Sequence, residues 1–152
     1  KLFTKTFDML KEAKFPITVH AGEWDGPERI REAISLLHPT RLGHGVRSIE
    51  DPELIKYIKE LDIVLETCPT SNIATKIYKD YKDHPVKKLF DQGIKITVNS
   101  DDPPFFNASI AGEYTVMKNL GLSDDDLKLL TRNAIKSAFC DQHIKSQLLK
   151  KI

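Results

Sequence analysis

Hydrophobic positions along the chain alternate between helical spacing and short continuous runs. Residues 2–13 carry apolar side chains at helical spacing, and the β-branched run at 17–20 after Pro16 favours a buried strand. The same change recurs along the chain. We expect strands at 17–20, 40–45, 62–69 and 94–104, and helices at 2–13, 27–38, 51–61, 84–93, 109–121, 123–139 and 141–152.

Local signals place several helix ends. Asp51 before Pro52 is typical of a helix start, Gly93 of a helix end, and Ser123 with Asp126 of a capping box. Strands separated by helices favour right-handed crossovers and a parallel sheet covered by helices. No stretch is typical of an interdomain linker, so we predict an α/β fold in which residues 1–152 form one segment.

Composition narrows the classes of partner. The 152 residues include 23 basic and 22 acidic side chains, which gives no electrostatic reason to expect nucleic acid or an anionic membrane as partner. Apolar runs fall well short of the roughly 18 residues that suggest a membrane span, and we expect a cytoplasmic protein. Cys68 and Cys140 are far apart and form no CxxC, so both are interpreted as reduced thiols.

Polar side chains capable of chemistry follow the predicted strands at the points where the strands end. In a parallel α/β sheet these carboxyl ends open into loops on one edge, where functional groups collect. The residues at these positions are His20, Glu23, His44, Glu66, Thr67, Cys68, Asp101 and Asp102.

Each candidate also has a structural interpretation. His20 alone is as compatible with a structural role as with a ligand, but Gly22 permits a sharp turn that would bring Glu23 beside it. The Asp101-Asp102 pair before proline could be a simple turn, although adjacent carboxylates repel each other unless a cation or a donor lies between them. The other histidines lie in helical or loop stretches without polar companions and are interpreted as inert: His38, His84 and His143.

These residue types favour a zinc site. Imidazole and carboxylate are suitable zinc ligands, and a catalytic zinc uses about three protein ligands and a water. His20 and Asp101 are the candidate ligands. Glu23 and His44 are candidates for moving protons beside the activated water.

Four motifs together resemble one family. "HAGE", "RLGHG", "CPTSN" and "VNSDDP", in this order and at these separations, resemble the adenosine deaminases, which are zinc-dependent (β/α)₈ barrels of the amidohydrolase group. The resemblance runs from about Phe3 to the C-terminus and corresponds to the second half of the barrel. It implies half of a TIM barrel, with four parallel strands, flanking helices and C-terminal helices.

The resemblance also implies a role for each candidate. His20 and Asp101 resemble zinc ligands, and Glu23 resembles the residue that binds the purine and donates a proton to N1. His44 resembles the residue that orients and stabilises the hydroxide nucleophile, and Asp102 the hydrogen-bond partner of purine N7. The "CPTSN" segment is expected to shape the pocket, without a nucleophilic role for its cysteine.

The implied reaction is hydrolytic deamination of adenosine, and of deoxyadenosine, to inosine and ammonia. Adenine deaminases and N6-methyl-AMP deaminases share the motifs and are the alternatives, although "TSN" favours the nucleoside enzymes. The family's His-x-His zinc ligands occur nowhere in the sequence, which begins with Lys1. We therefore expect an incomplete metal site, a chain that is inactive in isolation, and the N-terminal half of the same barrel or a second copy of the chain as partner.

Another class of function is a noncatalytic α/β domain. A nucleotide-binding domain of this kind would need a glycine loop such as GxGxxG or GxxxxGK[ST] to cradle phosphates, and neither occurs. A natural half-barrel that pairs with its own copy, or one without catalytic activity, is the other alternative.

Overall fold

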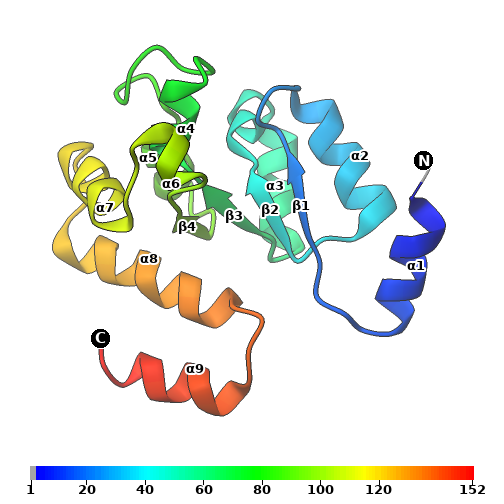
Figure 1. The fold of residues 1–152 in the computed structure, drawn as a ribbon. Helices are drawn as coiled ribbons and strands as arrows, with labels where there is room; N and C mark the ends of the chain where they lie inside the picture. Colours follow the sequence, from blue (N-terminus) through cyan, green and yellow to red (C-terminus); the bar gives the residue numbers. More distant parts are fainter. Residues whose placement is uncertain (1–2) are drawn as a thin grey trace.

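A computed structural model of the chain describes residues 3–152 and has a parallel four-stranded sheet at its centre (Figure 1). The elements in chain order are α1 (Thr4–Glu12), β1 (Thr18–Ala21), α2 (Pro27–Leu37), β2 (Arg41–His44), the 3₁₀ helix η1 (Val46–Glu50), α3 (Pro52–Glu60), β3 (Val64–Thr67), α4 (Pro69–Ala74), α5 (Val86–Asp91), β4 (Ile96–Val98), α6 (Pro103–Phe106), α7 (Ile110–Asn119), α8 (Asp124–Ser137) and α9 (Gln142–Leu149).

The strands lie in their sequence order, β1-β2-β3-β4, and each pairs parallel with the next. At least one helix connects each strand to its neighbour, as parallel pairing requires. The predicted α/β fold with a parallel sheet is confirmed. The described helices include none long and apolar enough to cross a membrane.

Helix ends follow the local signals. Oδ1 of Asp51 accepts the backbone N–H groups of Glu53 and Leu54 at the start of α3. Ser123 and Asp126 form the predicted capping box of α8. Gly93 takes a φ of +78° just after α5, a conformation that glycine adopts without a Cβ penalty.

Two strands are shorter than predicted. The run at 62–69 stays extended only to Thr67, and the run at 94–104 only to Val98. Short helices begin soon after each, at Pro69 and at Pro103. Proline has a helical φ and needs no amide partner in the first turn, so at these positions it starts a helix.

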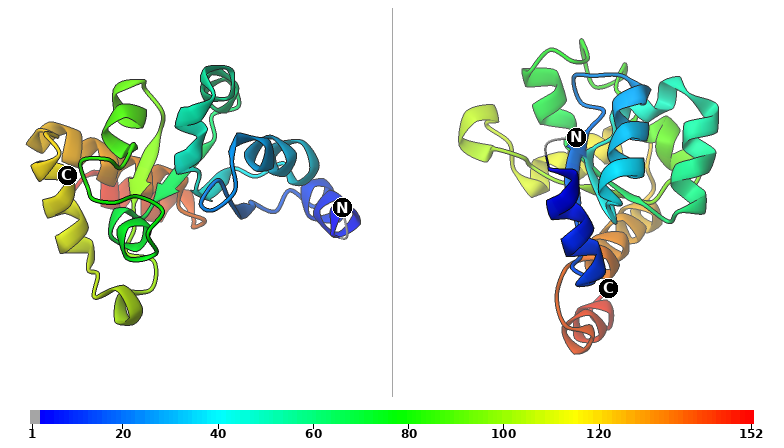
Figure 2. Two further views of the ribbon diagram at one scale, coloured as in Figure 1. Left: turned by 90° about the horizontal axis from the view of Figure 1, so that it is seen from above. Right: turned by 90° about the vertical axis from the view of Figure 1, so that its right-hand side faces the viewer.

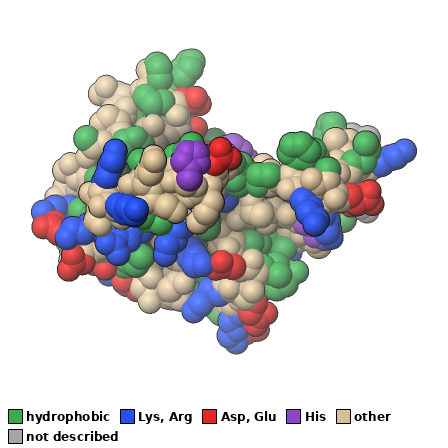
Figure 3. Space-filling view, turned by 90° about the horizontal axis from the view of Figure 1, so that it is seen from below, with side chains coloured by type: hydrophobic (Ala, Val, Ile, Leu, Met, Phe, Trp, Pro, Cys, Tyr) green, Lys and Arg blue, Asp and Glu red, His purple; other side chains and the backbone are tan. Residues whose placement is uncertain are grey.

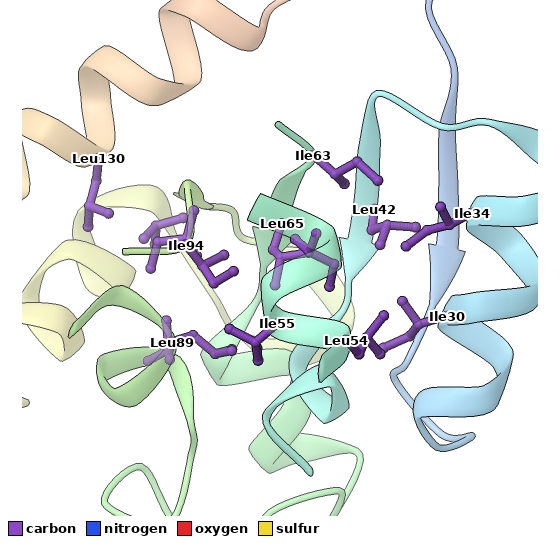
Figure 4. Packing of buried hydrophobic residues seen from close by; sticks show 14 of the residues in the cluster. Ile30, Ile34, Leu42, Leu54, Ile55, Ile63, Leu65, Leu89, Ile94 and Leu130 are labelled. Carbon is purple, nitrogen blue, oxygen red and sulfur yellow. The ribbon is translucent and has the colours of Figure 1, made fainter. Parts of the chain in front are cut away.

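The face of the sheet that is covered by helices carries the hydrophobic core. Leu42, Leu65 and Ile96 lie at paired positions in adjacent strands and are fully buried. Ile30 of α2 and Leu54 of α3 belong to the same core cluster (Figure 4). Truncating one such side chain to alanine typically costs about 2–5 kcal/mol of stability, so this layer holds the strand ends rigid.

The opposite face of the sheet is polar. His20, Gly43, Glu66 and Thr97 form one row across the four strands, because the register pairs each with the next. Arg41 lies on the same side and makes a 3.2 Å ion pair with Glu66. A polar row of this kind suits the lining of a site better than a packed core.

Helix α1 lies beyond β1 and beside α2, at one end of the molecule (Figure 2). Its surroundings expose large apolar side chains: Phe3 is 68%, Met9 62% and Phe15 62% exposed. Seen from the side of α8 and α9, hydrophobic side chains also gather on this narrow N-terminal part (Figure 3). Several large apolar side chains exposed in one part of a molecule are typical of a surface that another part of a protein covers.

Candidate active site

Residues from the carboxyl ends of three strands line one cleft. His20 lies in β1, His44 ends β2, and Asp101 follows β4. With Glu66 and Cys68 they line a cavity of about 320 Å³. A larger cleft of about 480 Å³ lies along the free side of β1 and is also lined by His20. The predicted gathering of polar side chains at the strand ends is therefore present.

The backbone at this cleft adopts unusual conformations. His44 has a φ of +61° and Asp101 a φ of +55°, both in the left-handed region that most residues avoid. Such conformations cost of order 1–3 kcal/mol each and persist where the surrounding structure imposes them, often at functional sites. Gly45, with a φ of +64°, has no room for a side chain, because a Cβ would lie 2.7 Å from Cδ2 of Leu65.

His44 lies between two carboxylates. Its Nε2 is 3.4 Å from Oε2 of Glu23 and 3.8 Å from Oδ2 of Asp101. The His44 side chain is only 2% exposed, whereas Glu23 and Asp101 are 19% and 23% exposed. The ring of His20 lies beside it, with the two ring centroids 5.4 Å apart. These four predicted site residues thus come together, with His44 the most enclosed.

Burial controls the protonation of this group. Desolvation raises the pKa of Glu23, the negative charge of Asp101 adds to the rise, and His20 opposes it. Desolvation lowers the pKa of His44 although Asp101 acts in the opposite direction. The cleft therefore shifts Glu23 toward its protonated form and His44 toward its neutral form.

Asp102 lies apart from this group. It precedes α6, and its carbonyl oxygen accepts the N–H groups of Phe105 and Phe106. Its side chain is exposed and is not among the described residues that line the 320 Å³ cavity. The expected contact of Asp102 with purine N7 stays a prediction.

Helix α4 supplies two site residues that the sequence interpretation missed. Ser71 donates its hydroxyl to Oδ2 of Asp101 at 2.7 Å, and Nδ2 of Asn72 lies 3.2 Å from Nδ1 of His44. Both side chains are fully buried. They belong to the "CPTSN" segment, which was expected only to shape the pocket, so the motif was the available signal.

A buried carboxylate holds α4 in place. Glu113 of α7 is fully buried, and its two oxygens accept the N–H of Thr70 at 3.2 and 3.4 Å. Burial raises the pKa of Glu113, and the hydrogen bonds from Thr70 act against that rise. The position of α4, and with it that of Ser71 and Asn72, therefore depends on α7.

The interpretation of His84 as a histidine without polar companions is wrong. His84 is only 3% exposed, its Nε2 is 3.0 Å from Oδ1 of Asn72, and its Nδ1 accepts the N–H of Val86 at 3.2 Å. Burial, and then the nearby His44, lowers the pKa of His84 to about 4. The loop after α4 brings His84 back against Asn72 of that helix, which no local pattern around His84 indicates.

Gly43 is a further residue that the sequence interpretation did not single out. A Cβ at this position would lie 3.0 Å from Cγ and Cδ2 of the His20 ring, closer than such atoms normally approach. The glycine therefore sets where the His20 imidazole can lie.

We expect Gly43→Ala to displace that ring by a few tenths of an ångström and to weaken metal binding about 10- to 100-fold, the usual scale for disturbed ligand support. Zinc titration of the complete protein against a chelator measures the change. The control is Gly121→Ala, because no atom lies within 4 Å of a Cβ there, although its φ of +95° costs some stability. Equal zinc affinity in Gly43→Ala and wild type would contradict this role.

The donor set fits part of a metal centre. Among residues 3–152, potential ligand atoms of His44, Cys68 and Asp101 lie within 4.8 Å of one another, and His20 lines the same cavity. Burial, followed by the charge of Asp101, raises the pKa of the Cys68 thiol, and a protonated thiol is a poor ligand. His44 and Asp101 are then left of this group, while His20, the ligand predicted with Asp101, lines the same cavity. The predicted pair of His20 and Asp101 is one ligand fewer than the three protein ligands of a typical catalytic zinc.

Comparison with known proteins decides the family. The family model described as adenosine deaminase matches residues 1–152. The chain belongs to this family. An adenine deaminase of Rhizobium rhizogenes is 44% identical over 151 residues, which are 99% of this chain and 47% of that protein. The chain thus spans about half the length of the curated relatives it matches.

Solved structures of the family match the fold closely. An adenine deaminase from Arthrobacter aurescens superposes with a TM-score of 0.92 at 30% identity, over 98% of this chain and 46% of that one. An amidohydrolase from Burkholderia ambifaria with bound Zn has a TM-score of 0.86 at 30% identity, over 96% and 42% of the two chains. The N6-mAMP deaminase of Arabidopsis has a TM-score of 0.86 at 27% identity, over 98% and 45%.

These matches confirm that the chain forms half of a barrel, as the motifs indicated. They also bear on the substrate. Three of the relatives named above are adenine or N6-mAMP deaminases. The alternative interpretation therefore fits better than the nucleoside interpretation that "TSN" had favoured.

Proposed function

We propose that residues 1–152 form a single segment, the C-terminal half of the barrel of a deaminase that hydrolyses the 6-amino group of adenine. The observation that carries the proposal is the placement of Nε2 of His44 between the carboxylates of Glu23 and Asp101 at the strand ends. The similarity to adenine deaminases supports the choice of base.

His20 and Asp101 are the residues that would hold zinc, together with ligands from the other half of the barrel. Bound zinc acts as a Lewis acid and makes water a nucleophile at neutral pH. The bound Zn in the Burkholderia ambifaria amidohydrolase supports the choice of metal. Ser71, whose hydroxyl donates to Oδ2 of Asp101, would keep that carboxylate oriented.

Proton transfer would depend on Glu23. Water adds to C6 of the purine, the ring nitrogen N1 gains a proton, and the 6-amino group leaves as ammonia. The raised pKa of Glu23 suits a carboxylic acid that donates this proton. His44, enclosed and neutral, would orient the attacking water, and Asp102 would be the hydrogen-bond partner of N7.

The test compares substrates on the complete protein. We expect kcat/KM for adenine to exceed that for adenosine and for N6-methyl-AMP by about 100-fold or more, a ratio that a pocket closed around the base achieves. Formation of the 6-oxopurine product, followed by ultraviolet absorbance, measures each reaction, because N6-methyl-AMP would release methylamine where adenine and adenosine release ammonia. A preference for adenosine or deoxyadenosine would restore the nucleoside interpretation, and turnover of none of the three would support a noncatalytic half-barrel and overturn the proposal.

A further inference from the structure

A chain of hydrogen-bonding groups leads away from the site into the protein. The N–H of Val86 donates to Nδ1 of His84, and Nε2 of His84 is 3.0 Å from Oδ1 of Asn72. Nδ2 of the same Asn72 lies 3.2 Å from Nδ1 of His44. All three side chains are buried, at 3% exposure or less.

The donor and the acceptor of each hydrogen bond in this chain can be assigned by starting at the N–H of Val86 and moving toward His44. A backbone N–H only donates, so Nδ1 of His84 carries no proton. A neutral imidazole has one proton, which must then be on Nε2 and point at Asn72. The pKa of about 4 keeps His84 neutral near pH 7.

The same logic orients the amide of Asn72. Its carbonyl oxygen must face the N–H of His84, because the reversed amide would set two donors against each other. The NH₂ group therefore faces His44, whose Nδ1 can only accept. The single proton of a neutral His44 is left on Nε2.

We propose that Asn72 and His84 are positioning residues that select the tautomer of His44. The inference rests on the proposed function, in which His44 orients the attacking water. With its proton on Nε2, His44 offers a donor to the space between Glu23 and Asp101. The other tautomer would turn a lone pair toward the carboxylate of Asp101, which is unfavourable, and would orient water the opposite way.

A purely structural role of the pair is the simpler alternative. Buried polar groups are normally hydrogen-bonded, and the loop between α4 and α5 needs some anchor. A structural role requires only that each buried polar group has a hydrogen-bond partner. Tautomer selection requires, in addition, that the donors and acceptors occur in this order. A substitution that keeps the shape of the Asn72 side chain but replaces its N–H donor with an acceptor therefore distinguishes the two roles.

Asn72→Asp in the complete protein is that substitution. The carboxylate has nearly the same shape but can only accept, so Nδ1 of His44 must become protonated. We expect kcat for adenine to fall by about 100-fold or more, the scale of a misdirected acid-base group, with KM and zinc content within about twofold of wild type. Histidine-selective ¹⁵N NMR should show Nδ1 of His44 unprotonated in wild type and protonated in the variant.

His84 supplies a second pair of variants if Asn72→Asp fails to fold. His84→Gln keeps an N–H donor toward Asn72 and should stay within about fivefold of wild-type kcat, whereas His84→Leu should lose at least about tenfold. His143→Gln, an exposed position in α9, is the control. Equal kcat in the Gln and Leu variants would overturn the inference.

The NMR measurement separates this inference from the proposed function. A wild-type His44 already protonated on Nδ1 would overturn tautomer selection even if adenine is deaminated. A wild-type protein that shows the expected tautomer but turns over no adenine would instead overturn the proposed function.

Discussion

Glu23→Gln in the complete protein is expected to lower kcat for adenine by about 10²–10⁴-fold, the usual contribution of a positioned acid or base. Glutamine has almost the same shape as glutamate but no acidic proton to give to N1. The Glu23 side chain follows β1, is 19% exposed and lies 3.4 Å from Nε2 of His44. An acid from solvent is therefore a poor substitute for it as proton donor. Steady-state ammonia release and zinc content should be measured on the same preparation.

The zinc content decides how a loss of activity is interpreted. We expect the zinc content to stay near wild type, because the role proposed for Glu23 is on the substrate and not as a ligand. Glu60→Gln is the matched control, since Glu60 is exposed at the end of α3, near the amino ends of the strands. Loss of zinc in Glu23→Gln, or unchanged kcat, would contradict the role of proton donor.

His20→Ala should remove the metal and, with it, activity. The substitution deletes the imidazole of one of the two ligands proposed among residues 3–152, and metal affinity falls steeply when a ligand is lost. We expect less than about a tenth of the wild-type zinc after dialysis, and at least about a 10³-fold loss of kcat, because water activation depends on the metal. Metal analysis by atomic emission and the ammonia assay measure the two effects.

Cys68→Ser is the informative comparison. Its thiol lies in the group of potential ligand atoms with His44 and Asp101, but burial raises its pKa and disfavours the thiolate. The serine variant should therefore keep its zinc. Full zinc in His20→Ala, or loss of zinc in Cys68→Ser, would show that the ligand assignment is wrong.

The helix boundaries show where sequence interpretation succeeds. Asp51 and Ser123 were identified as caps because a cap is a contact between residues two or three apart, and both contacts are present. The strands were overextended where polar loops and prolines follow them. Whether Pro69 continues an extended segment or begins a helix depends on what the next turn packs against, and α4 contacts α6 and α7.

The candidate site shows the same division. His20, His44 and Asp101 were expected at one edge because parallel strands in register present their carboxyl ends together, and that expectation needs only strand order. The roles proposed for these residues stay predictions: His20 and Asp101 as zinc ligands, and His44 as the residue that orients water. The enclosure of His44, to 2% exposure, needed the packing of α4 above it.

The sequence by itself determined the alternation of strands and helices, the edge at which polar residues gather, and the four motifs that mark the family. These properties come from periodicity and from contacts between near neighbours, so they are present in the order of residues. Only the tertiary structure decided which groups touch. Ser71 and Asp101 are 30 positions apart, Asn72 and His44 are 28 apart, and His84 and Asn72 are 12 apart. Hydrogen bonds over such separations depend on how α4 packs against the strand ends and how the loop after it returns to Asn72, and no local pattern encodes that geometry.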